Sequence, residues 1–256
     1  MSKLMAHPFD ICPGRGQCLK AKMSTQEHNN KKPKKGESPQ GAPSVHHLRP
    51  GMTLVKNFLK RKEQFEIVQM CRHLGVGLGG FHHPEYKNGA KLKLWMMCLG
   101  KNWDPISCSY GATRSFDGAP APAIPRKFIK NAQSAITMVG GVPLINPDIC
   151  IVNFYNDTGR LGLHQDKDES RSSIEQGLPV ISVSIGDTAE FMFGDTRDQS
   201  KASRVNLDSG DVLVLGGESR LLFHGISHVK PHTAPAWLKE ETGLRPGRLN
   251  LTFRQY

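Results

Sequence analysis

The stretch L-G-L-H-Q-D-K-D, residues 161–168, places His164, Asp166 and Asp168 at alternate positions. If it is a β-strand, the three side chains share one face, because successive side chains of a strand point to opposite faces. A histidine nitrogen and a carboxylate oxygen on one face can bind the same divalent metal ion. The stretch therefore predicts part of a metal site that needs another ligand from elsewhere in the chain.

A candidate for that ligand is His224, which ends the apolar run R-L-L-F-H at residues 220–224. A lone histidine in such a place is more often structural, and 11 histidines allow a chance H-x-D match. Two histidines and one carboxylate nonetheless form the facial triad of non-haem Fe(II) oxygenases, which leaves metal positions open for other ligands. An H-x-D followed downstream by a strand-terminal histidine favours this interpretation.

The last expected strand carries polar side chains on one face. Arg248, Asn250, Thr252 and Arg254 alternate there with apolar residues. Exposure of that face to solvent is the common explanation. The alternative is a buried arginine face that binds an anionic ligand, since a guanidinium binds a carboxylate through two hydrogen bonds.

Composition narrows the class of protein. The chain has 256 residues with 38% hydrophobic content, enough for one folded domain of ordinary size and a tail. No apolar run approaches the ~20 residues of a membrane span, and we expect neither a secretory signal nor a membrane partner. The 6 cysteines form no C-x-x-C motif, which indicates reduced thiols. The net charge of +11 favours nucleic acid as a partner, although a basic tail alone could explain part of it.

Three regions are predicted along the chain. Residues 1–43 are polar and lysine-rich, and are expected to form a disordered basic tail whose K-K-P-K-K, at 31–35, is either a nuclear-import or nucleic-acid patch or a solvated linker. Residues 44–139 contain helical patterns at 59–74 and 126–139 and a strand within 91–99. Residues 140–256 contain short β-rich runs separated by turn residues, which predict a sandwich or jelly-roll barrel. These runs are 149–155, 160–164, 179–186, 189–194, 204–207, 211–215, 220–224 and 248–256.

Beyond these patterns, several segments from about residue 94 to the C-terminus resemble the AlkB family of Fe(II)/2-oxoglutarate dioxygenases. They are N-F-Y (153–155), L-H-Q-D-K-D-E (163–169), V-I-S-V-S-I-G (180–186), G-G-E-S-R-L (216–221), F-H-G-I (223–226) and R-L-N-L-T-F-R-Q (248–255). The resemblance implies a mostly β fold: a double-stranded β-helix, or jelly-roll, core at 140–256, flanking helices, and a nucleotide-recognition lid within 44–139.

The resemblance also implies roles for individual residues. Fe(II) is expected on His164, Asp166 and His224. The co-substrate 2-oxoglutarate is expected near Asn153, Tyr155, Arg248, Asn250 and Arg254, with Arg248 at the distal carboxylate and Arg254 near the metal. The target nucleotide is expected near Trp103, Tyr110, Asp168 and Arg197. Trp103 and Tyr110 could instead be ordinary core residues, and Arg197 lies in D-T-R-D, where the sequence departs from the family pattern.

The activity implied is oxidative demethylation of DNA bases, either 1-methyladenine and 3-methylcytosine or N6-methyladenine, with Fe(II), 2-oxoglutarate and O₂. Formaldehyde, succinate and CO₂ are the expected products. The alternatives are an RNA or tRNA demethylase, a nucleic-acid-binding module with little turnover, and a dioxygenase that acts on protein side chains. We expect a monomer in the nucleus and cytoplasm, with an organelle left open, and a substrate that is single-stranded or has a flipped base.

Overall fold

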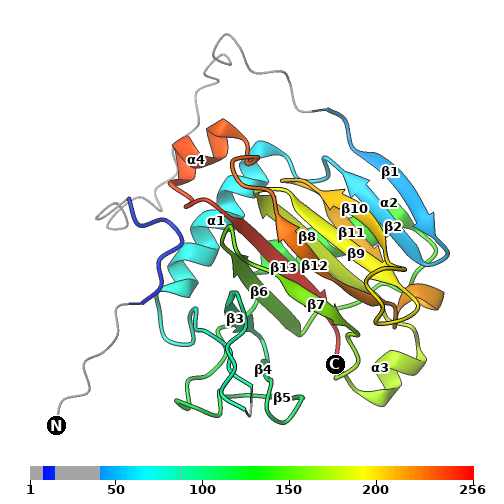
Figure 1. Ribbon diagram of the computed structural model, residues 1–256, viewed down its shortest axis with the longest axis horizontal. Helices are drawn as coiled ribbons and strands as arrows, with labels where there is room; N and C mark the ends of the chain where they lie inside the picture. Colours follow the sequence, from blue (N-terminus) through cyan, green and yellow to red (C-terminus); the bar gives the residue numbers. More distant parts are fainter. Residues whose placement is uncertain (1–7, 15–40, 87) are drawn as a thin grey trace.

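The computed structural model describes residues 8–14, 41–86 and 88–256, and two antiparallel sheets form its centre (Figure 1). In spatial order, the 7-stranded sheet contains β1 (Ser44–Arg49), β2 (Met52–Lys56), β11 (Val212–Leu215), β8 (Val180–Gly186), β13 (Arg248–Arg254), β6 (Ile149–Tyr155) and β3 (Trp95–Leu99). The 4-stranded sheet contains β10 (Ser203–Leu207), β9 (Ala189–Gly194), β12 (Phe223–Val229) and β7 (Leu161–His164). This arrangement confirms the predicted jelly-roll core.

Outside the two sheets, the described residues form a short hairpin and four α-helices. The hairpin pairs β4 (Asn102–Asp104) with β5 (Ser109–Gly111) and belongs to neither sheet. The helices are α1 (Arg61–Gly75), α2 (Arg126–Val139), α3 (Arg171–Glu175) and α4 (Ala236–Thr242), and one 3-10 turn, η1, spans Gly217–Ser219. Within the residues that the structure describes, no helix combines the length and apolar character needed to cross a bilayer.

Apart from the exposed edge strand β1, the large sheet is largely buried on both faces, because each face has its own apolar partner. Toward the helices, Val152, Val183 and Leu251 pack with Val68 of α1 and Phe128 of α2. The opposite face packs against the small sheet in a second cluster, which includes Leu54, Ile151 and Leu213 with Phe191 and Ile226. The site residues of the large sheet belong to this second, inner face.

The alternation in β13 is thereby explained, and its polar face is not exposed. Arg248, Asn250, Thr252 and Arg254 are between 1% and 9% exposed. Leu249, Leu251 and Phe253 point toward the helices, so the polar residues point into the space between the sheets. The explanation of this pattern as a solvent-facing surface was wrong.

Most elements follow the sequence pattern. Seven of the eight β-rich runs after residue 148 coincide with strands, and α2 coincides with the predicted helix at 126–139. The run at 220–224 overlaps only the first two residues of β12, so the expectation that His224 ends its strand was wrong, and His224 lies near the start of β12. The helix predicted at 59–74 begins at Arg61, because the Glu63 carboxylate accepts a hydrogen bond from the backbone N–H of Lys60, at 2.8 Å, and ends the extended segment there. The short helices α3 and α4 and the hairpin of β1 and β2 were not predicted.

The boundary predicted at residue 140 does not divide the fold. Strands β1, β2 and β3 precede that position, yet they flank strands β11 and β6 of the same sheet. Residues 44–56 and 95–99 therefore belong to the core sheet. The hairpin β4–β5 belongs to the segment expected to contain the lid, and it lies outside both sheets.

Residues 8–14 correct the prediction of a disordered tail over this short range. Ile11 and Cys12 are fully buried, and the Phe9 ring stacks on Trp95 with 4.0 Å between ring centroids. The Asp10 carboxylate binds Arg72 of α1 at 2.8 Å. Apolar burial and this ion pair stabilise a segment too short to show a pattern in sequence. The K-K-P-K-K stretch lies outside the described residues.

The Asp10–Arg72 pair predicts a measurable contribution to stability. Asp10→Asn removes the charge from a hydrogen-bonded pair in which the Arg72 side chain is 9% exposed, so the free energy of unfolding should fall by about 1–2 kcal/mol in urea titrations. Glu66→Gln, which breaks the exposed pair with Lys127, is the control and should change it by less than about 1 kcal/mol.

The same pair gives the effect a pH dependence. Burial alone would raise the pKa of Asp10, but hydrogen bonds from Arg72 and the Cys12 backbone hold it below the usual 3.8. A carboxyl group with a lowered pKa stabilises the fold above its ordinary pKa and loses that contribution as the pH falls through its folded-state pKa. The difference between wild type and Asp10→Asn should therefore be largest at neutral pH and should shrink in acid. A difference that grows in acid would contradict this assignment.

Candidate active site

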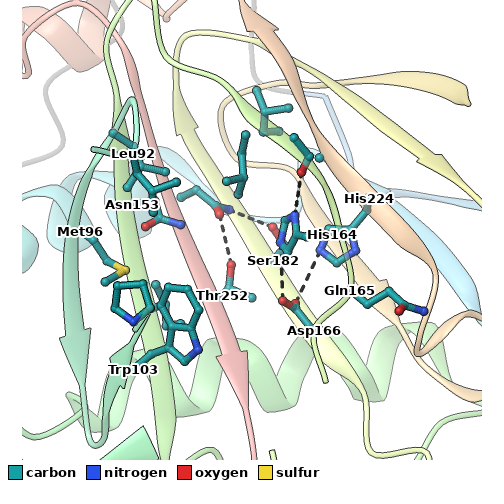
Figure 2. A pocket seen from close by; sticks show the side chains of 18 of the residues that line it. Leu92, Met96, Trp103, Asn153, His164, Gln165, Asp166, Ser182, His224 and Thr252 are labelled. Atoms are coloured by element: carbon teal, nitrogen blue, oxygen red, sulfur yellow. Dashed lines mark hydrogen bonds and ion pairs between the residues drawn. The ribbon is translucent and has the colours of Figure 1, made fainter. Parts of the chain in front are cut away.

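A cavity of about 620 Å³ lies between the two sheets, and the hairpin β4–β5 forms part of its wall (Figure 2). Every residue that the sequence assigned to a site lines this cavity. These are Trp103, Tyr110, Asn153, Tyr155, His164, Asp166, Asp168, Arg197, His224, Arg248, Asn250 and Arg254. The structure thus brings them together, and their individual contacts differ.

The candidate metal ligands converge at the end of β7. Strands β7 and β12 pair with His164 directly opposite His224, and Asp166 follows two residues after β7 ends. The Asp166 carboxylate lies 3.7 Å from Nε2 of His164 and 3.6 Å from Nε2 of His224. One ligand atom from each residue lies within 4.8 Å of the others. The expectation that a continuous strand aligns residues 164–168 was wrong, because a loop after His164 turns Asp166 back toward the histidines.

Backbone carbonyls orient both imidazoles. Nδ1 of His164 donates to the Gly162 carbonyl at 2.9 Å, and Nδ1 of His224 donates to the Leu222 carbonyl at 3.0 Å. With the proton on Nδ1, each Nε2 keeps its lone pair free for a metal. The donor set of two imidazoles and one carboxylate fits Fe(II).

The charges of these ligands also suit a metal. Burial, and then the neighbouring His224, lowers the pKa of His164 to about 4, so its imidazole is neutral at pH 7. Burial alone would raise the pKa of Asp166, but Arg254 and His224 hold it well below its usual range. A neutral histidine and an ionised carboxylate are the forms that bind metal ions.

Gly225 allows the two histidines to face each other. A Cβ atom at this position would lie 2.5 Å from the Leu161 carbonyl oxygen and 2.8 Å from that of Gly162. The close approach of β12 to β7 beside His224 therefore requires glycine.

Arg248 is the best candidate in the cavity for binding a carboxylate. The residue is 1% exposed, and its guanidinium donates from Nη2 to the Ser184 hydroxyl at 3.1 Å, while Nε and Nη1 have no hydrogen-bond partner. Its cationic group lies 5.4 Å from the centre of the Tyr155 ring, and burial lowers the pKa of Arg248 to about 10. A buried cation with unused donors beside a cavity fits one end of a dicarboxylate such as 2-oxoglutarate.

Neighbouring amides complete this polar wall. Nδ2 of Asn250 donates to the Ser182 hydroxyl and to the Val183 carbonyl, each at 2.8 Å, and its Oδ1 accepts from the Thr252 hydroxyl at 3.1 Å. These bonds orient Asn250 firmly. Asn153 is 9% exposed, and its buried Oδ1 has no partner, so it remains free to bind a ligand.

Arg254 connects the metal site to the hairpin. Its Nη2 lies 2.6 Å from the Asp166 carboxylate, and its Nη1 donates to the Tyr110 hydroxyl at 3.0 Å. The hydroxyl of Tyr110, a residue expected beside the nucleotide, thus accepts a hydrogen bond from Arg254, a residue expected beside the co-substrate. Burial raises the pKa of Tyr110, so the hydroxyl stays protonated.

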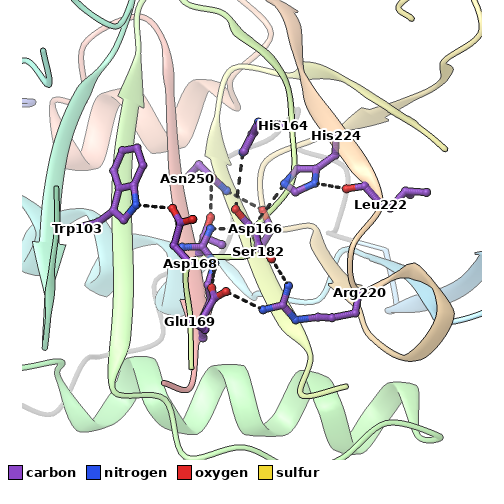
Figure 3. A network of polar contacts seen from close by, with 12 residues as sticks. Trp103, His164, Asp166, Asp168, Glu169, Ser182, Arg220, Leu222, His224 and Asn250 are labelled. Atoms are coloured by element: carbon purple, nitrogen blue, oxygen red, sulfur yellow. Dashed lines mark hydrogen bonds and ion pairs between the residues drawn. The ribbon is translucent and has the colours of Figure 1, made fainter. Parts of the chain in front are cut away.

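Trp103 and Asp168 form the other contact between hairpin and core. The indole Nε1–H donates to the Asp168 carboxylate at 2.8 Å (Figure 3). Trp103 also pairs across the hairpin with Tyr110, and both rings pack partly on the inner apolar cluster. The core-packing interpretation therefore applies in part to both residues, and their contact with a nucleotide stays a prediction. The Arg197 guanidinium lies 5.6 Å from the centre of the Phe223 ring.

Two buried charges of the site were missed in the sequence. Glu169 and Arg220 form an ion pair of 3.0 Å, and Glu169 also lies 3.0 Å from Arg254. Both residues stand within the motifs quoted above. Because spacing alone does not show that two charges so far apart in the chain meet, only the fold could reveal the pair.

Gly225 provides a test of the metal site. Gly225→Ala should weaken binding of Mn(II), a redox-stable probe for Fe(II), because overpacking costs about 1–3 kcal/mol, or about 5- to 150-fold in affinity if it falls on the bound geometry. Calorimetric titration would measure this. Gly162→Ala is the matched control, since a Cβ there meets nothing within 4 Å, and Asp166→Ala should abolish binding. Equal Mn(II) affinity in both glycine variants would contradict the role of Gly225.

Arg248 predicts opposite effects with and without a ligand. Arg248→Met should maintain or raise the melting temperature of the ligand-free protein, because it replaces a buried, sparsely paired cation by an apolar side chain. The same variant should lose about 1.5–3 kcal/mol of 2-oxoglutarate binding, through loss of charge-assisted hydrogen bonds. Thermal melts with increasing 2-oxoglutarate would measure both effects. Unaltered stabilisation by 2-oxoglutarate would place its carboxylate elsewhere.

Comparison with known proteins is consistent with this geometry. The model of the 2OG-Fe(II) oxygenase superfamily matches residues 51–254. The protein named "DNA N(6)-methyladenine demethylase ALKBH1C" of Arabidopsis thaliana is 53% identical, over 97% of this chain and 56% of its own length. The chain thus spans about half the length of the Arabidopsis relatives that it matches.

A bacterial relative and a solved structure extend the match. The "Alpha-ketoglutarate-dependent dioxygenase AlkB homolog" of Caulobacter vibrioides is 35% identical over 65% of this chain and 70% of its own length. "The structure of OsALKBH1" superposes with a TM-score of 0.80 at 56% identity, covering 83% of this chain and 100% of the solved one. By its family match, its relatives and its fold, the chain belongs to the AlkB family of the 2OG-Fe(II) oxygenase superfamily.

Proposed function

We propose that this protein is an Fe(II)/2-oxoglutarate-dependent oxidative demethylase of N-methylated bases in DNA, with N6-methyladenine, 1-methyladenine and 3-methylcytosine as candidate substrates. One observation carries the proposal. A single cavity is lined by the candidate metal triad, by the Arg248 guanidinium with two nitrogens that lack a hydrogen-bond partner, and by the Trp103–Asp168 pair. Sites for the metal, an anion and a planar base thus adjoin one another.

The overall reaction balances for this set of ligands. Bound Fe(II) and 2-oxoglutarate, with O₂, supply an oxidant strong enough to hydroxylate a methyl C–H bond. One oxygen atom of O₂ enters succinate as 2-oxoglutarate loses CO₂, and the other forms the hydroxymethyl group on the base nitrogen. The C–N bond then breaks, the nitrogen regains a proton, and the carbon leaves as formaldehyde.

The residues of the chain bind and orient the reactants. His164, Asp166 and His224 would hold the metal, and Arg248 would bind the distal carboxylate of the co-substrate. Arg254, bound to Asp166 at 2.6 Å, would orient the end nearest the metal.

The target base would lie against Trp103 and Asp168. The Trp103 ring offers a flat surface for stacking. Asp168 uses Oδ2 for the indole N–H, so its other oxygen can accept from the exocyclic N–H of adenine or cytosine. Ligand and base recognition would thus both use residues already fixed by the fold.

Basic side chains support a nucleic-acid substrate. Lys91, Lys93, Arg160, Lys167 and Arg197 all line the cavity. They could bind backbone phosphates with a salt-sensitive affinity that does not depend on sequence. A base must leave its stack to reach the metal site, which favours single strands or weakened pairs. A monomer located in the nucleus and cytoplasm remains our prediction.

RNA is the second candidate substrate. The relative named "tRNA demethylase abh1" of Schizosaccharomyces pombe is 27% identical over 57% of this chain. The complete triad argues against a binding module with little turnover, and the basic cavity lining argues against a protein substrate. DNA is favoured because relatives of higher identity carry DNA demethylase names.

The deciding experiment uses a panel of methylated DNA and RNA oligonucleotides. Each would be incubated with the protein, Fe(II), ascorbate and 2-oxoglutarate, and analysed by mass spectrometry. We expect loss of one methyl mass from at least one DNA oligonucleotide and none with Asp166→Ala. Methyl loss from RNA alone would favour the second candidate, and no loss from any member would overturn the proposal.

A further inference from the structure

Glu169 is a buried carboxylate that lies between Arg220 and Arg254, next to the candidate metal ligands. Its side chain is 0% exposed, and it lies 3.0 Å from Nη2 of Arg220 and 3.0 Å from Nε of Arg254 (Figure 3). A buried carboxylate is costly unless it is closely paired. The two ion pairs therefore balance this charge, and they tie Glu169 to both arginines at once.

Arg220 links Glu169 to the backbone of Asp166, a candidate metal ligand. It is 5% exposed, its Nη1 donates to the backbone carbonyl of Asp166, and its Nε donates to the Leu178 carbonyl at 2.7 Å. Asp166 lies in a loop after β7 that belongs to no strand. The Arg220 fork, oriented by Glu169, thus helps to fix the Asp166 backbone.

Arg254 transmits the same tie to the ligand-binding side of the site. Its Nη2 lies 2.6 Å from Oδ2 of Asp166, the oxygen that also lies 3.6 Å from Nε2 of His224. This carboxylate must therefore serve both the metal site and an arginine. Glu169 gives Arg254 a second negatively charged partner, and unlike Asp166 it is not one of the candidate metal ligands.

We propose that Glu169 is a positioning residue, which orients Arg254 toward 2-oxoglutarate and, through Arg220, holds Asp166 in place for the metal. The inference rests on the proposed function, since it assigns a role within that site. Two buried cations, Arg220 and Arg254, and two buried anions, Asp166 and Glu169, form a balanced group. Within this group, Glu169 connects Arg220, which binds the backbone of the Asp166 loop, to Arg254, which lines the cavity.

Glu169→Gln tests the role of the charge, since it maintains the shape of the side chain and removes its negative charge. Calorimetric titration of the full chain, first with Mn(II) and then with 2-oxoglutarate, should show lower affinity for both. The affinity for Mn(II) should fall by about 10- to 100-fold, the usual effect of losing a residue that orients metal ligands. Binding of a methylated oligonucleotide, followed by fluorescence anisotropy, should stay unchanged. Weaker ligand binding with unchanged oligonucleotide binding would distinguish a positioning role from a general loss of structure.

Two further variants sharpen the test. Glu175→Gln is the control, because Glu175 is an exposed residue paired with Arg171 on the nearby helix α3. Glu169→Asp maintains the charge on a shorter side chain and should retain more 2-oxoglutarate affinity than Glu169→Gln. The visible absorption of the anaerobic Fe(II)–2-oxoglutarate complex should weaken in the same order.

Three outcomes would overturn the proposal. They are equal 2-oxoglutarate affinity in Glu169→Gln and Glu175→Gln, equal losses in Glu169→Gln and Glu169→Asp, or a joint loss of metal, co-substrate and oligonucleotide binding with a collapsed melting temperature. Failure of the proposed function is distinguishable. Wild type would then bind Mn(II) and 2-oxoglutarate but demethylate no oligonucleotide, while the role of Glu169 in binding would still hold.

Discussion

Two arginines buried on the inner face of β13 determine the character of this site. Burial of a guanidinium between two sheets is unfavourable unless negative or polar partners surround it. Arg254 has such partners in Asp166, Glu169 and Tyr110. Arg248 has a serine hydroxyl and a tyrosine ring instead, with two nitrogens unused. Arg254 is therefore held in place by the protein's own side chains, whereas Arg248 keeps unused donors for a ligand.

The fold maintains this difference through register. Strand β13 lies between β6 and β8, and all three are buried along their whole length. Arg248 stands opposite Tyr155 on one side and Gly186 on the other, and Asn250 stands opposite Asn153 and Ser184. A shift by one residue would exchange the polar and apolar faces of β13, which would put leucines in the cavity and arginines against the helices. The site and the core are thus specified by the same pairing.

Much of this could be predicted from local pattern. Alternating and apolar runs were enough to predict seven of the eight strands after residue 148 and the first two residues of β12, and helical spacing predicted α2 with its buried Phe128 and Ala132. The H-x-D motif identified two residues that do meet, but the strand assumed to align them ends at His164. The hairpin of β1 and β2 was missed because β1 is a largely exposed edge strand with little alternation. Its place beside β11 depends on contacts between residues far apart in sequence, such as Val55 with Val212.

The hairpin β4–β5 shows why the remaining contacts could not be predicted. Its strands are only three residues each and pair with neither sheet, so backbone hydrogen bonds do not position it against the core. Trp103 and Tyr110, which face each other across it, instead bind Asp168 and Arg254. Both partners were recognisable as site residues, whereas their contacts with the hairpin depend on the fold. Ion pairs with Asp166 and Glu169 fix the place from which Arg254 reaches Tyr110, while the Trp103–Asp168 hydrogen bond holds the other strand of the hairpin without them.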